Sequence, residues 1–297
     1  MEMQVFNEVL TEKNIAERLE FHNELPNQIS PDKPEYRQEL LRQILNKLTT
    51  LSPEQVPTLF STIHTLLDEK QMVLSLKTVD DQKVFRQLGW TGDLTFPTCP
   101  AAYVANGCVV DGLALVESNI GANRANAYIA RQQEHTAVLS RSGVRHERKI
   151  QYTNAATTKA WPKGDYRTYM RAYMPGKPTN LVVTFDGTTL PSNEVAVRET
   201  EFGTEVAFVV TVPIASTKSL RIQYDENQAL TPTSTYVFYE NRQAGLTEPI
   251  PTLKIVYPQD WRVSSLAPSA NNLGSQLQFP PSQTAYLMRV VQFTPAQ

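Results

Sequence analysis

Residues 111–131 carry the side chains whose types and spacing come closest to a chemical site. An apolar run at 113–116 predicts a short buried strand, and a glycine turn with Asn119, Asn123 and Arg124 follows it. Amide and guanidinium groups at the end of a strand can hold an anion or another chain. The same groups can instead fix the conformation of a loop. Asn119, Asn123 and Arg124 are therefore the candidate ligand-binding residues, with both interpretations open.

The rest of the sequence offers no recognisable catalytic arrangement. It lacks the Gly-x-Ser-x-Gly turn of serine hydrolases and the Gly-x-x-x-x-Gly-Lys loop that wraps a phosphate. The adjacent carboxylates at 80–81 and 225–226 point in different directions in regular structure. The four histidines stand apart in the sequence, at His22, His64, His135 and His146. We therefore predict no catalytic residue, no metal site and no cofactor.

A basic run at 141–149 could favour anionic polymers. At strand spacing, Arg145 and Glu147 share one face of this run. His146 and Arg148 share the other. The expected structure is a solvated strand face, whose ion pairs contribute little to stability.

Three tyrosines, Tyr166, Tyr169 and Tyr173, line the predicted strand at 166–174. Exposed aromatic rings bind sugars or partner chains, whereas buried rings build the core. We expect these tyrosines to belong to the core.

Composition limits the possible classes of protein. The 297 residues, 41% of them hydrophobic and 20% charged, suit a globular protein of one large domain or two. The net charge is −2, so the chain lacks the overall basic charge expected of a general nucleic-acid binder. No stretch approaches the roughly 20 apolar residues that span a bilayer. The N-terminus shows no signal peptide, and this feature taken alone predicts a cytoplasmic protein.

Two cysteines, Cys99 and Cys108, lie close together in the sequence. Two thiolates alone do not complete a structural zinc site. A local disulfide and two unrelated thiols remain equally open on the residues themselves.

The first third of the chain has helical periodicity. The predicted helices cover residues 12–21, 34–48, 53–67 and 79–88, with a short buried strand at 72–76.

From about residue 109 the hydrophobic period changes from 3.6 to 2, with turn residues between short runs. The predicted strands cover residues 109–116, 128–139, 144–152, 166–174, 181–185, 194–200, 205–212, 219–224, 235–239, 253–257 and 285–293. This pattern predicts an α+β protein: a helical or mixed α/β remnant at 1–92, then an antiparallel, immunoglobulin-like β-sandwich at 93–297. A split near 225–235 into two sandwiches stays open.

Several segments together resemble a known family. The segment 111–128, with its Asp, apolar strand, Asn, Gly turn and Asn-Arg-Ala-Asn, is similar to the segment that identifies a bacterial cell-envelope family catalogued as domain of unknown function 4012. Leu-Gly-Trp-Thr-Gly at 88–92, Tyr-Met-Arg-Ala-Tyr-Met-Pro-Gly at 169–176 and the turn at 241–245 are also similar to that family. The similarity covers nearly the whole chain.

This sequence departs from the family pattern at Arg124, Asn126 and Ala244, where the family has Lys, Asp and Pro. Family members usually begin with a membrane anchor and an α/β region that distantly resembles the LytR-CpsA-Psr envelope phosphotransferases. The resemblance therefore implies that this chain is a fragment of a membrane-anchored, extracytoplasmic protein. That location favours a disulfide between Cys99 and Cys108.

The leading functional hypothesis is a non-catalytic cell-envelope protein that binds wall polymer, such as wall glycan, or other surface proteins. The alternative is part of a phosphotransferase-like polymer assembly factor whose active site lies in a missing N-terminal half. A third hypothesis is a soluble cytoplasmic domain. None of the three involves nucleic acid, and membrane contact is expected only through the missing anchor.

Overall fold

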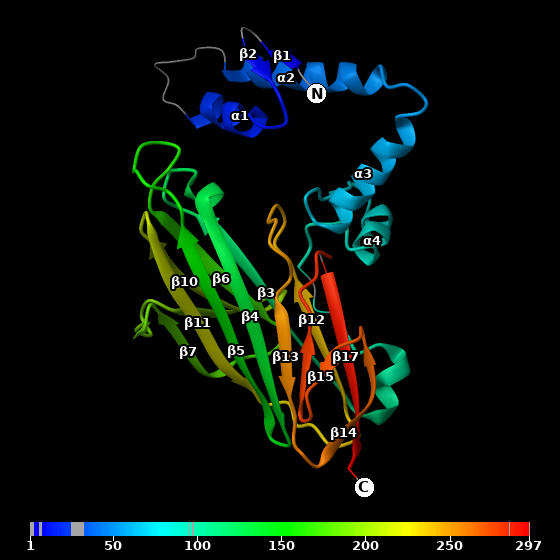
Figure 1. The fold of residues 1–297 in the computed structure, drawn as a ribbon. Helices are drawn as coiled ribbons and strands as arrows, with labels where there is room; N and C mark the ends of the chain where they lie inside the picture. The colour runs from blue at the N-terminus through cyan, green and yellow to red at the C-terminus, as the bar shows by residue number, and fades with distance from the viewer. Residues whose placement is uncertain are drawn as a thin grey trace. The chain divides into compact units, whose positions relative to one another are not determined.

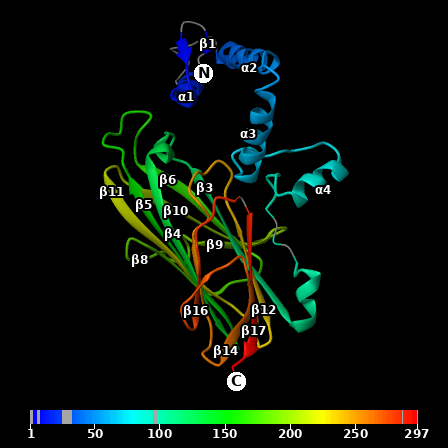
Figure 2. The same ribbon diagram turned by 45° about the vertical axis from the view of Figure 1, so that its right-hand side comes forward.

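A computed structural model describes residues 3–5, 8–24, 33–94, 96, 98–284 and 286–296. The chain divides into two compact units, Met1–His64 and Thr65–Gln297. Figures 1 and 2 give the course of the chain through both units.

The first unit is small. Its short strands β1 (Met3–Val5) and β2 (Glu8–Leu10) pair antiparallel, and helices α1 (Ile15–Glu24) and α2 (Lys33–Thr49) follow. Its buried apolar residues are Leu10, Tyr36 and Leu40. The carboxylate of Glu8 accepts a hydrogen bond from Arg18 Nε at 2.9 Å. This bond ties β2 to α1 and lowers the pKa of Glu8.

The four predicted helices are present. Helix α3 (Val56–Asp68) begins three residues later than the proline at 53 suggests, and α4 (Val79–Gln87) matches its prediction within one residue. Among the helices of the described residues, none is both long enough and apolar enough to cross a membrane. The predicted buried strand at 72–76 is wrong, because within the described parts of the chain this segment makes a single bridge, between Leu74 and Thr91. Its side chains at Met72 and Val73 are exposed.

The second unit is built on two mixed β-sheets. The seven-stranded sheet has the order β14-β17-β12-β3-β6-β10-β9 and the eight-stranded sheet the order β15-β16-β13-β4-β5-β11-β7-β8. The strands of the first are β14 (Trp261–Ala267), β17 (Tyr286–Pro295), β12 (Thr235–Asn241), β3 (Cys108–Asn119), β6 (Tyr166–Met174), β10 (Gly203–Val212) and β9 (Ala196–Thr200). Those of the second are β15 (Asn271–Asn272), β16 (Gln276–Phe279), β13 (Thr252–Val256), β4 (Ile129–Ser140), β5 (Gly143–Asn154), β11 (Ser216–Glu226), β7 (Thr179–Phe185) and β8 (Thr188–Thr189).

One hydrophobic core lies between the two sheets. Alternate residues of the long strands enter it, as the period of 2 predicts, with Leu113 and Phe208 from one sheet and Ile150 and Ile222 from the other. Figure 1 labels long strands of both sheets, such as β3 and β6 of the first and β4 and β5 of the second. The β-rich α+β architecture expected from the sequence is therefore present.

Two strand pairs differ from the predicted antiparallel arrangement. Strand β12 runs parallel to β3, with Thr235 opposite Cys108, and β13 runs parallel to β4. The strands after residue 235 therefore belong to both sheets, and they pair there with strands β3 and β4 from before residue 225. The period of 2 reveals which residues form a strand, but it does not reveal the partner of that strand.

The compact units also divide at a different place from the predicted boundary at 92/93. Residues 65–94 contact the strand-rich part, because Gly245 N donates to Lys70 O at 2.9 Å and Gln71 Nε2 donates to Leu246 O at 2.6 Å. These partners lie up to 175 residues apart in the chain. The predicted boundary followed the change in composition from helical to strand-rich sequence. The observed boundary lies earlier, because long-range hydrogen bonds join residues 65–94 to the strand-rich part.

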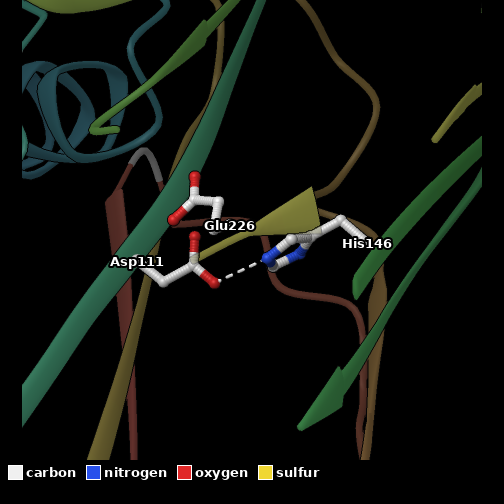
Figure 3. A group of neighbouring side chains, drawn as sticks. All are labelled: Asp111, His146 and Glu226. Atoms are coloured by element: carbon white, nitrogen blue, oxygen red, sulfur yellow. Dashed lines mark ion pairs between the residues drawn. The ribbon is translucent and has the colours of Figure 1, made fainter. Parts of the chain in front are cut away.

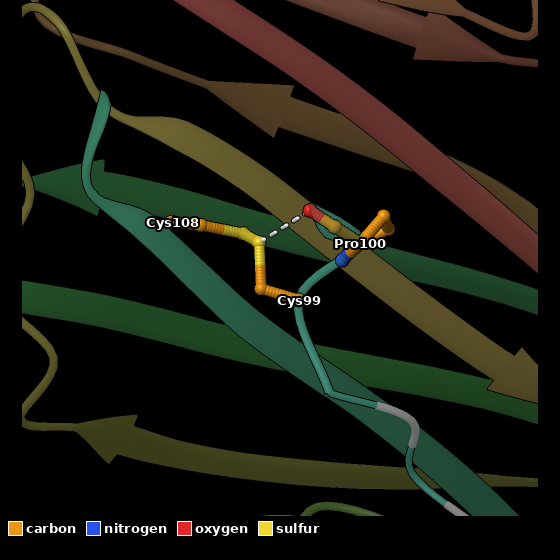
Figure 4. Close-up of a disulfide and its surroundings, with 3 residues drawn as sticks. All are labelled: Cys99, Pro100 and Cys108. Atoms are coloured by element: carbon orange, nitrogen blue, oxygen red, sulfur yellow. Dashed lines mark hydrogen bonds between the residues drawn. A yellow bond between two sulfur atoms is a disulfide. The ribbon is translucent and has the colours of Figure 1, made fainter. Parts of the chain in front are cut away.

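A disulfide joins Cys99 to Cys108 at the start of β3 (Figure 4). The 3-10 helix η1 (Ala101–Asn106) lies within the loop that it closes. Tyr103 from this loop packs on Val237 and Tyr239, on the outer face of the seven-stranded sheet. The disulfide thus fixes the loop at 99–108, which packs on that face.

Replacing both cysteines by serine is expected to lower the free energy of unfolding by about 2–3 kcal/mol, because the closed loop restricts the unfolded chain. Denaturation of the double variant and of the reduced wild-type protein should show equal losses. A thiol assay on unreduced protein secreted from an oxidising compartment should find no free thiol. Two free thiols there would contradict the bond.

Candidate functional site

The predicted ligand-binding residues Asn119 and Asn123 form a turn. Asn119 Nδ2 donates to Asn123 O at 2.8 Å, and Gly121 N donates to Asn119 Oδ1 at 2.9 Å. Asn123 Nδ2 donates to Asp165 O at 3.0 Å, while its Oδ1 accepts from Ala125 N at 3.0 Å. The side-chain amides of both residues are thus occupied within the protein, and the geometry is that of a loop held in one conformation.

Arg124, the third predicted residue, precedes the 3-10 helix η2 (Ala125–Tyr128). Its backbone N donates to Pro162 O at 2.8 Å, which joins this turn to the loop before β6. The three predicted residues therefore lie together at one end of β3.

The expectation of a solvated face for the basic run is wrong for half of the strand. Arg145 is exposed on β5, but His146 and Arg148 are buried. Their face of β5 points into the core, where strands from distant parts of the chain supply polar partners. Polar alternation alone does not separate a solvated face from a buried polar one.

The first buried polar group contains two arginines and one carboxylate. Arg148 Nη1 lies 2.6 Å from Glu240 Oε1, and Arg289 Nη1 lies 3.2 Å from Glu240 Oε2. Arg148 Nη2 also donates to Gln133 Oε1 at 3.0 Å. All three charged residues are almost completely buried. Burial lowers the pKa of Arg289, and the charge of Glu240 counters this effect.

The second group surrounds Arg131. Its guanidinium lies 2.9 Å from Glu117 Oε2 and 2.8 Å from Glu248 Oε1. The hydroxyls of Tyr152 and Tyr166 donate to Glu117 at 2.9 and 2.6 Å. Burial lowers the pKa of Arg131, but the charge and hydrogen bonds of Glu117 together with Tyr166 and Glu248 outweigh this effect, so the pKa rises overall.

The third group contains both buried histidines. His135 Nε2 lies 3.0 Å from His146 Nδ1, although the sequence separates the two residues by a hairpin. His146 Nε2 lies 2.9 Å from Asp111 Oδ2, and Glu226 lies beside them (Figure 3). Burial lowers the pKa of His135 well below its ordinary value. The sequence did carry a signal for the two histidines: the turn at 142–143 sets a hairpin register that places them diagonally on one face.

A pocket of about 400 Å³ opens on the outer side of the seven-stranded sheet. Its lining combines cationic, amide and aromatic side chains: Lys70, Gly92, Asp93, Leu94, Val116, Tyr173, Phe202, Arg242, Gln243 and Ala244. A neighbouring pocket of about 470 Å³ shares Asp93, Leu94 and Phe202 with it. We call the first of these the cation pocket.

The two cations of this pocket are buried without a carboxylate at ion-pair distance among the residues described. Arg242 donates instead to the carbonyl oxygens of Leu246 and Gln283, the latter at 2.6 Å. Burial lowers the pKa of Lys70 and of Arg242. Asp93, the acidic residue of the lining, pairs with Arg86 at 2.8 Å. Asp93 acts on Lys70, and Glu69 and Glu248 act on Arg242, only from beyond ion-pair distance.

An aromatic wall completes the cation pocket. Tyr173 lies on β6 with its hydroxyl donating to Glu205 Oε2 at 2.6 Å, and Arg198 Nε donates to Glu205 Oε1 at 2.5 Å. These bonds hold the ring in place. The prediction of core tyrosines is right for Tyr166, whereas strand alternation places Tyr169 and Tyr173 on the opposite face of β6.

Comparisons with known proteins find only weak similarity. No protein-family model matches the chain, and no curated protein matches it. Among solved structures, a putative nutrient binding protein from Legionella pneumophila is 6% identical, with a TM-score of 0.43 over 61% of this chain and 71% of that chain. Yeast LTA4 hydrolase in complex with bestatin is 12% identical, with a TM-score of 0.30 over 57% of this chain and 30% of that chain.

An M1 zinc metallopeptidase mutant from Deinococcus radiodurans is 10% identical, with a TM-score of 0.28 over 55% of this chain and 42% of that one. The chain thus spans less than half of the length of these two enzymes. Similarity at this level carries no argument about function. The functional argument rests on the residues of the chain itself.

Proposed function

We propose that the chain is a non-catalytic, extracytoplasmic binding protein of the cell envelope, and that the cation pocket holds an anionic group of a wall polymer. One observation carries this proposal: Lys70 and Arg242 are buried in one pocket without a carboxylate at ion-pair distance among the described residues. A buried cation without an anionic group in direct contact is costly, and an anionic ligand would supply that contact.

The other lining groups suit a polymer with sugar or polyol units. The ring of Tyr173 and the side chain of Phe202 offer apolar surfaces. Gln243 Nε2 donates to Glu117 O at 2.9 Å and its Oε1 accepts from Glu117 N at 2.7 Å, which holds this side chain of the lining against β3. Aromatic surface beside polar and charged groups is the usual composition of a small-ligand site.

The location in the envelope is supported by two features. The resemblance described above implies an extracytoplasmic protein, and the disulfide between Cys99 and Cys108 is typical of oxidising compartments. An immunoglobulin-like topology stays part of this proposal, since that family of folds commonly serves binding at cell surfaces.

Lys70→Gln is expected to weaken binding of a poly(glycerol phosphate) chain about 10-fold or more, because a charge-assisted contact is lost. Lys77→Gln is the matched control, since Lys77 lies in the same segment but is exposed. This control should bind within about twofold of the wild type, as a screened surface charge contributes little. Isothermal titration with poly(glycerol phosphate), and with neutral dextran as the comparison polymer, measures both variants.

Affinity for poly(glycerol phosphate) should also fall as salt concentration rises. Equal binding of dextran, or wild-type affinity in Lys70→Gln, would refute the cation pocket as an anion site. Release or transfer of phosphate from the polymer by the wild-type protein would instead support the phosphotransferase-like alternative.

A further inference from the structure

We propose that Asp111, His146 and Glu226 form a binding site for one divalent transition-metal ion, such as Zn²⁺ or Mn²⁺, that joins the two sheets. Each residue offers one donor atom, and the three donor atoms lie within 4.8 Å of one another. Figure 3 shows the three side chains directed toward a common space. This site lies in the core and is separate from the cation pocket.

The distances suit a shared ion. Metal bonds of about 2.0–2.2 Å place two ligands of one ion about 3–4 Å apart. His146 Nε2 and Asp111 Oδ2 are 2.9 Å apart, and all three donor atoms lie within 4.8 Å of one another, so they need to approach by about 1 Å at most. The side chain of Glu226 can supply this movement. Gly176 lies beside its carboxylate, so close that an added Cβ would be 3.7 Å from Oε2, and as a glycine it has no side chain to restrict the carboxylate.

Unused donor atoms point to a ligand. Glu226 Oε1 and His146 Nε2 are buried and make no hydrogen bond within the part of the chain that the structure describes. His146 Nε2 lies near Asp111 Oδ2 at ion-pair distance but not in hydrogen-bond geometry. Buried polar atoms are nearly always satisfied in folded proteins. A metal ion would satisfy both atoms at once.

Neighbouring groups already orient the three ligands. His146 Nδ1 can donate to His135 Nε2 at 3.0 Å, which leaves the lone pair of His146 Nε2 free for a metal. Tyr236 OH donates to Asp111 Oδ2, and Gln228 Nε2 donates to Glu226 Oε2 at 2.9 Å. Metal ligands in proteins characteristically have such a second layer of hydrogen bonds.

The donor set indicates the class of metal. One imidazole and two carboxylates suit Zn²⁺ or Mn²⁺ better than Ca²⁺, which prefers oxygen donors alone. The two carboxylates would neutralise a divalent ion, so no net charge would remain in the core. Asp111 belongs to the seven-stranded sheet, and His146 and Glu226 belong to the other. The ion would therefore fasten one sheet to the other.

The test uses the full chain with its disulfide intact. Protein is unfolded in guanidinium with EDTA and refolded with or without Zn²⁺ or Mn²⁺, and metal content and melting temperature are measured. One ion per chain and a higher melting temperature than the metal-free protein are expected. Co²⁺ substitution should give a visible absorption spectrum that reports the nitrogen and oxygen donors.

Glu226→Gln nearly preserves the shape of the side chain and is expected to weaken metal affinity about 100-fold or more, measured against a competing chromophoric chelator. His146→Gln should alter the Co²⁺ spectrum. Glu147→Gln, which changes an adjacent carboxylate on the outer face of β5, should bind as the wild type does. Wild-type protein that refolds with Zn²⁺ and Mn²⁺ but retains neither would overturn the site. Undiminished affinity in Glu226→Gln would overturn it equally, whether or not His146→Gln folds.

Discussion

Glu240→Gln is expected to lower the free energy of unfolding by about 3–5 kcal/mol, because it leaves two buried guanidinium groups without their counter-charge. Glu240 lies between Arg148 and Arg289, and all three residues are nearly inaccessible to water. The glutamine has almost the same volume, so the loss measures charge compensation rather than a cavity.

Glu147→Gln is the matched control. Glu147 also contacts two cations, Lys149 at 2.6 Å and Arg221, but it lies on the outer face of the sheet with both partners about half exposed. Surface ion pairs contribute about 0–1 kcal/mol, so this variant should lose no more than that. Urea denaturation followed by tryptophan fluorescence compares the two variants, with the buried Trp261 as the probe of the sheets. Equal losses in both variants would show that burial of the Glu240 group has no special effect on stability.

Arg131→Met should destabilise the protein by a similar amount, about 3–5 kcal/mol. Its removal leaves the carboxylate of Glu117 in the core, where the hydroxyls of Tyr152 and Tyr166 are its remaining donors among the described residues. Glu248, at 20% side-chain exposure, would also lose its partner but can reach water.

Arg141→Met serves as the control for this second variant. Arg141 pairs with Asp260 at 2.5 Å, yet both side chains are more than half exposed. Its loss should cost less than about 1 kcal/mol. A stability of Arg131→Met within that range, in the same denaturation assay, would contradict the assignment of Arg131 as a buried counter-charge.

The strands were largely predictable from the sequence. The period of 2 located β6 without error and β3, β4, β5, β10 and β17 within about three residues at each end. Alternation of side chains in these strands reflects a core on one face only. The strands β14 and β16 were missed, because β14 has little apolar alternation and β16 is only four residues long.

The sites were much less predictable. Alternation correctly placed His146 and Arg148 on one face of their strand, but their polarity indicated solvent. Their partners Asp111 and Glu240 lie on strands β3 and β12, whose pairing with each other is parallel and joins distant segments. Sequence spacing does not report such contacts. The cation pocket was missed for the same reason, since Lys70 and Arg242 come from segments that meet only in the folded chain.

The pairing of β3 with β12 has a consequence for how the protein is made. Asp111 and Tyr236 hydrogen-bond to each other although 125 residues separate them. During synthesis, β3 therefore emerges long before β12 and carries an open hydrogen-bonding edge in the nascent chain. Folding dominated by such distant contacts is slow and exposed to aggregation. This edge of β3 gains its partner only when residues 235–241 have emerged.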